Sequence, residues 1–173
     1  MLKTTANKIT VLRILLIPVY LLLIYRGMRI PALLVYVIAC LSDMADGYIA
    51  RHYNQITNFG KFMDPLADKM LVLAAMCCFT EQGRMAGWIV ALVLFREFGV
   101  SGLRLVAAEQ NRVIAAAWSG KIKTAVTMIS LCAMTVLEYN WFDLTCSILI
   151  LMTTLVSGAE YFWRNRDVFQ DID

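Results

Sequence analysis

Six apolar segments, each close to the length of about twenty residues that crosses a lipid bilayer, dominate this chain of 173 residues. They cover residues 10–25, 31–52, 61–79, 86–108, 119–137 and 142–163. Segments of this length and composition predict membrane-spanning helices. We therefore expect an all-α integral membrane bundle of six transmembrane helices, formed by a single domain over residues 1–173.

The overall composition excludes most other classes of protein. Hydrophobic residues make up 60% of the chain and charged residues only 17%, which is far from the composition of soluble domains. The formal net charge of +3 is too small to indicate a nucleic-acid partner. The expected surroundings are therefore membrane lipid.

The distribution of lysine and arginine predicts how the bundle is oriented, because these residues accumulate on the cytoplasmic side. If the amino terminus is cytoplasmic, thirteen basic residues fall on the inner side and only Arg26, Arg29 and Arg84 on the outer side. We expect both termini in the cytoplasm and a multi-pass membrane protein.

Four aspartates gather on the second and third segments. Asp43 and Asp46 are three residues apart, and Asp64 and Asp68 are four apart, so each pair projects from one face of a helix. Carboxylates at membrane depth are costly and mark functional sites, and four together require compensating cations. Hard divalent ions such as Mg²⁺ or Mn²⁺ fit oxygen ligands, and two such ions are suited to displacement at phosphorus. The simpler reading is four helix-end charges that face water.

The residues between the aspartates fit a ligand site. Gly47, Ala50 and Gly60 are small, so a ligand or a neighbouring helix can approach the backbone there. Arg51 can neutralise a phosphate oxygen. The predicted acidic site therefore lies toward the cytoplasmic ends of the second and third segments, where a soluble product can leave.

This stretch resembles the signature of the CDP-alcohol phosphotransferase family, D-x-x-D-G-x-x-A-R-x(8)-G-x-x-x-D-x-x-x-D. Every fixed position is filled, from Asp43 to Asp68. The resemblance implies an integral membrane enzyme, a homodimer, that joins a CDP-linked donor, usually CDP-diacylglycerol, to an alcohol and releases CMP. It implies that Asp43, Asp46, Asp64 and Asp68 bind two divalent ions, and that Asp68 is also the general base.

The resemblance also implies which residues contact the nucleotide. It begins near the amino terminus with the pattern Asn7-x-x-Thr10-x-x-Arg13, followed by Pro18. The implied nucleotide-binding residues are Asn7, Asp43, Gly47, Ala50, Arg51 and Gly60.

A second group of charged residues lies in the fourth and fifth segments. Arg96 and Glu97 are adjacent in an apolar run, where they can form an internal ion pair. Basic residues beside an acidic metal site would form an anion pocket, which an acceptor with its own phosphate requires. The candidates are Arg104, which we expect to face the helix interior, Arg112, Lys121 and Lys123.

These motifs are similar to the bacterial branch of the family that produces phosphatidylglycerophosphate. That branch transfers the phosphatidyl group of CDP-diacylglycerol to sn-glycerol 3-phosphate. Two alternatives remain. The acceptor could be another alcohol, such as phosphatidylglycerol (a cardiolipin synthase) or inositol phosphate. In a different class, the carboxylates could be the ion pathway of a small cation transporter, although acids clustered at one end do not favour it.

Overall fold

Six long helices make up the described part of the chain, which comprises residues 5–52, 58–110, 112, 114, 115 and 117–169 of the computed structural model. Within these ranges the side chains of residues 5–8, 43–52, 58–62, 64, 65, 68 and 169 are outside the description. The helices are α1 (Thr5–Tyr25), α2 (Arg29–His52), α3 (Asn58–Glu81), α4 (Gly87–Glu109), α5 (Trp118–Val136) and α6 (Asn140–Arg164). A short 3-10 helix, η1 (Arg166–Phe169), follows α6, and the described residues contain no strand.

The prediction of an all-helical fold is confirmed, and each apolar segment coincides with one helix. The largest difference in boundaries is at α1, which begins at Thr5 rather than residue 10 and therefore includes Asn7. Among the described residues, α6 alone is long and apolar enough throughout to cross a membrane by length and composition. Two shorter apolar stretches are Ile9–Tyr25 and Arg29–Ser42.

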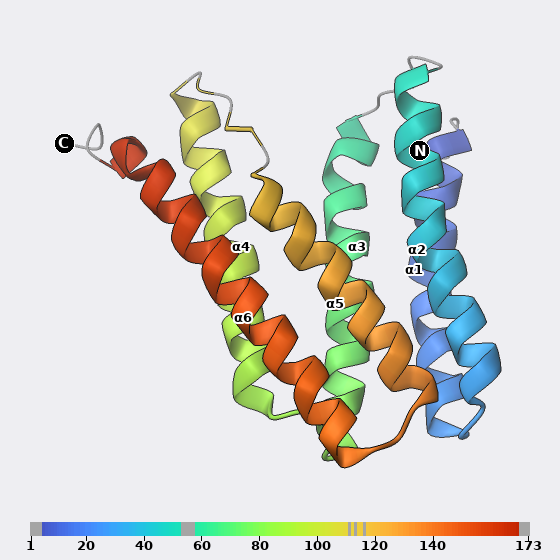
Figure 1. The fold of residues 1–173 in the computed structure, drawn as a ribbon. Coiled ribbons are helices and arrows are strands. Elements are labelled where there is room, and N and C mark those ends of the chain that lie inside the picture. The colour runs from blue at the N-terminus through green and yellow to red at the C-terminus, as the bar shows by residue number, and fades with distance from the viewer. Residues whose placement is uncertain (1–4, 53–57, 111, 113, 116, 170–173) are drawn as a thin grey trace.

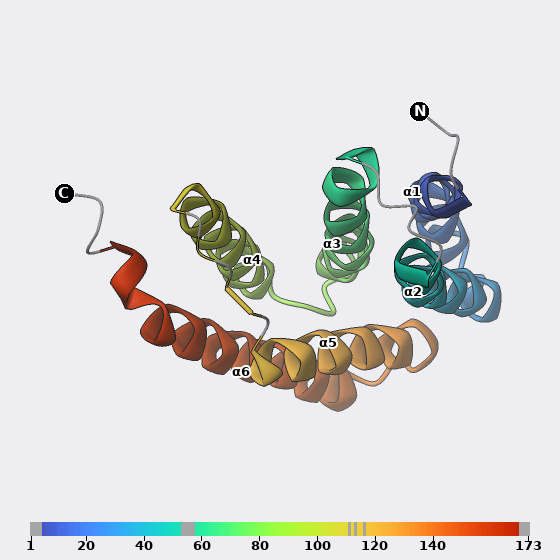
Figure 2. The same cartoon turned by 90° about the horizontal axis from the view of Figure 1, so that it is seen from above.

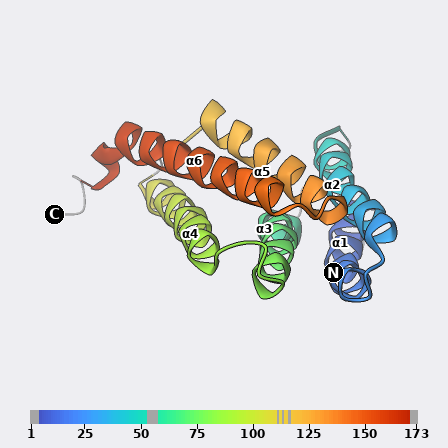
Figure 3. The ribbon, with the colours of Figure 1, turned by 60° about the horizontal axis from the view of Figure 1, so that its bottom comes forward.

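The helices run alternately up and down, so every second connection lies at the same end (Figure 1). The end of α2, the start of α3, the end of α4, the start of α5 and the end of α6 share the upper end in Figure 1. Seen from above, α5 and α6 lie across one side of the row formed by α2, α3 and α4 (Figure 2), and Figure 3 shows the same crossing from below. The candidate residues on α2, α3, α4 and α5 therefore belong to one end of the bundle.

The main hydrophobic core occupies the opposite half. It joins all six helices around fully buried side chains such as Tyr20, Tyr36, Phe79 and Met134. The rings of Tyr20 and Tyr36 lie 5.2 Å apart, and the Tyr20 hydroxyl is 3.2 Å from Thr135 Oγ1 across to α5. A smaller cluster joins α4, α6 and η1 near the upper end.

Arg84 ties the lower ends of the helices together. It follows Gly83, whose φ of +71° provides the left-handed turn after α3. Its guanidinium donates to both carboxylate oxygens of Asp143, at 2.9 and 2.7 Å, in the first turn of α6. It also donates to the carbonyls of Met134 and Leu137, at 2.8 and 2.6 Å. These carbonyls end α5 and lack helical partners, so one side chain satisfies polar groups of two helices.

We predict that Asp143→Asn lowers the free energy of unfolding by about 2 kcal/mol, because the half-buried Arg84 guanidinium loses two charge-assisted hydrogen bonds and keeps the more distant carboxylate of Glu138, at 3.7 Å. Asp167→Asn is the matched control, since its carboxylate is exposed and 4.0 Å from Arg166, and we expect a change within about 0.5 kcal/mol. Chemical denaturation in detergent micelles measures both. Equal stability of the two variants would contradict the structural role of Arg84.

Candidate active site

The acidic stretch lies on two neighbouring helices. The backbone of Asp43 and Asp46 belongs to the final turns of α2, and that of Asp64 and Asp68 to the first half of α3. These helices contact each other, so both pairs lie at the same end of the bundle. The side chains of the acidic and nucleotide candidates are outside the described part of the chain, so their roles stay predictions: Asn7, Asp43, Asp46, Gly47, Ala50, Arg51, Gly60, Asp64 and Asp68.

The residue types at this end fit a hard divalent cation, because carboxylate oxygens are the ligands that Mg²⁺ and Mn²⁺ prefer. Two pairs of aspartates on adjoining helices provide enough oxygens for two ions. Among the side chains that the structure describes, no group of three or more His, Cys, Asp or Glu could hold a metal. The acidic stretch stays the predicted metal centre, and its carboxylate side chains lie outside that search.

A buried arginine lies directly beside the acidic stretch. Arg13 of α1 is only 1% exposed, and its Nε donates to Ser42 Oγ at 3.2 Å. Ser42 immediately precedes Asp43 and donates in turn to the carbonyl of Ala39 at 2.7 Å. A buried cation is costly without nearby negative charge. Arg13 is part of the amino-terminal motif found in the sequence. The sequence did not show that Arg13 lies next to the start of the acidic stretch, because this depends on how α1 packs on α2.

A cavity of about 570 Å³ opens between α2, α3, α4, α5 and α6 at this end. Among the side chains that the structure describes, its charged lining comprises Lys69, Arg96, Arg104 and Lys121 together with one carboxylate, Glu97. Lys69 directly follows Asp68 along α3, so the basic cavity adjoins the acidic stretch. Four cations facing one anion attract a negatively charged ligand.

Glu97 is the centre of an ion cluster that joins three helices. Its Oε1 accepts hydrogen bonds from Lys123 Nζ of α5 at 2.7 Å and from Arg96 Nη1 of α4 at 2.9 Å. Its Oε2 is 3.8 Å from Lys69 Nζ of α3, and this lysine also donates to Ser101 Oγ. The predicted Arg96–Glu97 ion pair is confirmed, but the two lysines had not been predicted to join it.

Two of the predicted acceptor residues line the 570 Å³ cavity. Arg104 donates from Nε to the Tyr161 hydroxyl at 3.0 Å and lies over the Tyr161 ring. Lys121 Nζ lies 4.8 Å from the centroid of the Trp118 ring. The expectation that Arg104 faces the helix interior is wrong. Its side chain contacts Tyr161 of α6, but the residue as a whole is exposed. Exposure leaves both cations accessible to a ligand.

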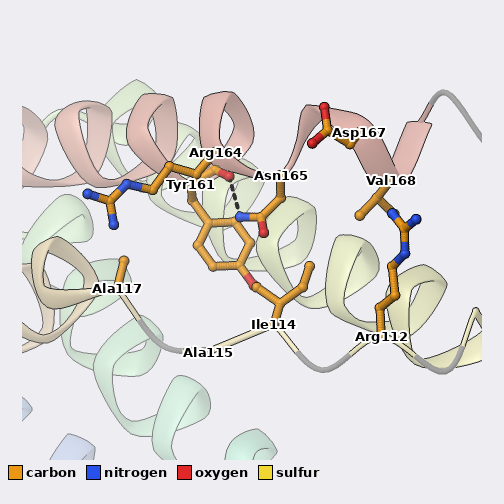
Figure 4. A pocket seen from close by; sticks show the side chains of 9 residues that line it. All are labelled: Arg112, Ile114, Ala115, Ala117, Tyr161, Arg164, Asn165, Asp167 and Val168. Atoms are coloured by element: carbon orange, nitrogen blue, oxygen red, sulfur yellow. Dashed lines mark hydrogen bonds between the residues drawn. The ribbon is translucent and has the colours of Figure 1, made fainter.

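The other two predicted acceptor residues lie elsewhere. Lys123 is 4% exposed, is held by Glu97, and lines an adjoining cavity of about 230 Å³. Arg112 lines a third cavity of about 380 Å³ with Arg164, Asp167 and other residues (Figure 4). That cavity shares Ala117 and Tyr161 with the largest one. Arg104 and Lys121 therefore line the same cavity of about 570 Å³. Lys123 and Arg112 line the two neighbouring cavities instead.

The comparisons with known proteins all point to the same family. The model of the CDP-alcohol phosphatidyltransferase family matches residues 3–158. A Bacillus subtilis (strain 168) protein named CDP-diacylglycerol–glycerol-3-phosphate 3-phosphatidyltransferase is 36% identical, over 95% of this chain and 96% of that protein. A probable phosphatidylglycerophosphate synthase of Mycobacterium tuberculosis is 34% identical, over 94% of this chain and 82% of that protein. An Escherichia coli (strain K12) protein with the same name as the Bacillus relative is 37% identical, over 71% of each chain.

Two glycines, Gly120 of α5 and Gly158 of α6, leave room for Arg96 where it passes between these helices. A Cβ on Gly158 would lie 3.2 Å from Arg96 Cγ, whereas a Cβ on Gly102 of α4 meets nothing within 4 Å. We predict that Gly158→Ala lowers the free energy of unfolding by about 1 kcal/mol through overpacking. Gly102→Ala, the control, should be neutral or stabilising by up to about 1 kcal/mol because alanine favours helices. A Gly158→Ala variant as stable as Gly102→Ala would refute the constraint on Arg96.

Proposed function

Because the chain belongs to the CDP-alcohol phosphatidyltransferase family, we propose that it transfers the phosphatidyl group of CDP-diacylglycerol to sn-glycerol 3-phosphate. The products are phosphatidylglycerophosphate and CMP. The observation that carries the choice of acceptor is the 570 Å³ cavity with its four cationic side chains beside the acidic stretch. An acceptor that brings its own phosphate needs such a surface, and an uncharged alcohol does not.

In this proposal Asp43, Asp46, Asp64 and Asp68 hold two divalent ions, Mg²⁺ or Mn²⁺. Bound there, the ions neutralise the charge of the diphosphate and favour CMP as the leaving group. The small residues Gly47, Ala50 and Gly60 let the nucleotide approach the backbone, and Arg51 and Asn7 complete that side. The buried Arg13 beside Ser42 adds fixed positive charge next to Asp43.

Asp68 takes the proton from the acceptor hydroxyl as general base. The hydroxyl oxygen then bonds to the phosphorus nearer the diacylglycerol. The bond from this phosphorus to the bridging oxygen breaks, and CMP leaves with that oxygen. Asp68 immediately precedes Lys69, which lines the basic cavity, so the proposed base and the acceptor surface adjoin along α3.

The acceptor phosphate binds to Arg104 and Lys121, and Lys69 and Arg96 add further positive charge to the lining of the cavity. Both Arg104 and Lys121 are exposed and supported by aromatic rings, which limits the conformations of their long side chains. Lys123 forms an ion pair with Glu97, so its positive charge offsets the negative charge of that carboxylate. Arg112 lies at the entrance from the neighbouring cavity and guides the anion rather than holding it.

We place the protein in the bacterial cytoplasmic membrane as a six-helix, multi-pass domain with both termini and the active site facing the cytoplasm. Large apolar side chains are exposed on every helix, as a lipid-facing surface requires; examples are Leu15, Leu34, Met70, Phe95, Ile129 and Leu149. The excess of lysine and arginine toward the upper end in Figure 1 supports the orientation. Family resemblance is the basis for proposing a homodimer.

The function is tested by incubating purified protein with CDP-diacylglycerol and Mg²⁺ and measuring CMP release. Parallel reactions contain sn-glycerol 3-phosphate, phosphatidylglycerol, inositol phosphate or no acceptor. We predict CMP release only with sn-glycerol 3-phosphate. Release with phosphatidylglycerol or inositol phosphate instead would refute the assigned acceptor, and release with none of them from folded protein would refute the reaction.

Lys121→Ala should raise the KM for sn-glycerol 3-phosphate by about tenfold, because a charge-assisted bond to phosphate is lost. The KM for CDP-diacylglycerol should stay nearly unchanged. Arg166→Ala is the control, since Arg166 is exposed beyond α6 and lies over Trp163 rather than in the cavity. A rise of equal size in both KM values would count against an acceptor site at Lys121.

Asp68→Asn should reduce kcat by at least about a hundredfold, because amide nitrogen and oxygen cannot take the proton. Binding of CDP-diacylglycerol, measured by equilibrium binding to protein in detergent, should be largely retained. The control is Asp167→Asn in the exposed segment after α6. A fully active Asp68→Asn enzyme would remove this residue as the base.

A further inference from the structure

Among the described charged side chains that line the cavity of about 570 Å³, Glu97 is a carboxylate and the others are cationic. For a cavity that only bound phosphate, this carboxylate would be a disadvantage, because it repels the anion. Its bonds to Lys123 and Arg96 explain how the charge is tolerated. They do not explain why the carboxylate lines the cavity, where it is available to a ligand.

The two oxygens of Glu97 differ in their surroundings. Oε1 accepts two hydrogen bonds, from Lys123 Nζ at 2.7 Å and from Arg96 Nη1 at 2.9 Å. Oε2 has Lys69 Nζ at 3.8 Å, which is an ion-pair contact beyond hydrogen-bonding distance. Among the described residues Oε2 therefore has no hydrogen-bond donor. An ionised carboxylate can only accept hydrogen bonds, so the group that suits Oε2 is a donor such as a hydroxyl.

The position of Glu97 shows which hydroxyl this would be. Arg104 and Lys121 lie on the side of the cavity formed by α4 and α5, and Lys69 lies on α3 next to Asp68. Glu97 contacts Lys69 and so lies toward the acidic stretch. In the proposed reaction the acceptor phosphate lies on Arg104 and Lys121 and the reacting hydroxyl lies at the acidic stretch. The hydroxyl left to meet a further group of the same cavity, such as Glu97, is then the one on the carbon between them.

Building on the proposed function, we propose that Glu97 is a specificity-determining residue that accepts a hydrogen bond from the middle hydroxyl of the acceptor. The site thereby selects a phosphorylated vicinal diol over a phosphorylated alcohol with one hydroxyl. A site that hydrogen-bonds a substrate hydroxyl discriminates against the analogue without it, since its own polar group is left unpaired. A hydrogen bond to a charged group corresponds to about a tenfold to hundredfold preference.

The test compares two acceptors, sn-glycerol 3-phosphate and 3-hydroxypropyl phosphate. Both carry a phosphate and a primary hydroxyl, and only the first has the middle hydroxyl. CMP release gives kcat/KM for each acceptor with the wild type, Glu97→Gln and the control Glu109→Gln, which lies exposed at the end of the same helix. Because two cations donate to Oε1, the glutamine oxygen should take that position and its NH2 group that of Oε2. The variant therefore replaces a charged acceptor with a neutral NH2 group, which can only donate to the hydroxyl oxygen and so forms a weaker bond.

We expect the wild type and Glu109→Gln to prefer sn-glycerol 3-phosphate by about tenfold to hundredfold in kcat/KM. Glu97→Gln should reduce this ratio to within about threefold, mainly by losing activity on sn-glycerol 3-phosphate. Any change in phosphate affinity caused by the lost negative charge affects both acceptors and cancels in the ratio. A Glu97→Gln variant that keeps the wild-type ratio, or that loses the same factor on both acceptors, overturns the proposal.

Two further outcomes separate this inference from the proposed function. A wild type that uses both acceptors equally well contradicts the role of Glu97 and leaves the phosphatidyl transfer intact. A wild type that releases no CMP with either acceptor contradicts the transfer itself. If Glu97→Gln does not elute from size exclusion as folded protein, Glu97→Asp replaces it. Aspartate keeps the charge but withdraws the carboxylate by one methylene, so the same loss of ratio is expected.

Discussion

The attraction of three cations to the carboxylate of Glu97 holds the upper end of this bundle together. The three cations come from three helices: Lys69 from α3, Arg96 from α4 and Lys123 from α5. Cavities of about 570 and 230 Å³ lie between the helices at this end. Three positive charges around one carboxylate also leave a surplus, which Arg104 and Lys121 increase. The same cluster therefore fixes the helices and makes the space between them attractive to an anion.

The two ends of the bundle serve different purposes. At the lower end, Arg84 is fully engaged by Asp143 and by the carbonyls that end α5, and the main hydrophobic core lies nearby. At the upper end, polar side chains line cavities, and Arg104 and Lys121 keep exposed charge. A cavity of about 390 Å³ also lies at the lower end, beside Arg84 and Asp143. The bonds of Arg84 and the main core nevertheless fix the helices there, which keeps the walls of the upper cavities in register.

The sequence predicted the elements well because a bilayer-length apolar segment leaves little choice but a helix. It also predicted that the acidic and basic groups lie at the same end of the bundle, because successive membrane-spanning helices run in opposite directions. It did not predict that Lys69 and Lys123 converge on Glu97, because this depends on how α3, α4 and α5 rotate against one another. The exposure of Arg104 and the separate cavity of Arg112 depend in the same way on where α6 crosses α4.

The proposed reaction combines an acidic wall on α2 and α3, which requires divalent cations, with a basic wall on α4 and α5, which receives a phosphate. The most direct measurement of this claim is CMP release from protein stripped with EDTA, followed by titration with Mg²⁺ or Mn²⁺. Release should stop in EDTA and return saturably with either ion, while size exclusion shows the stripped protein to be folded. Undiminished CMP release in excess EDTA would contradict the metal-dependent acidic wall.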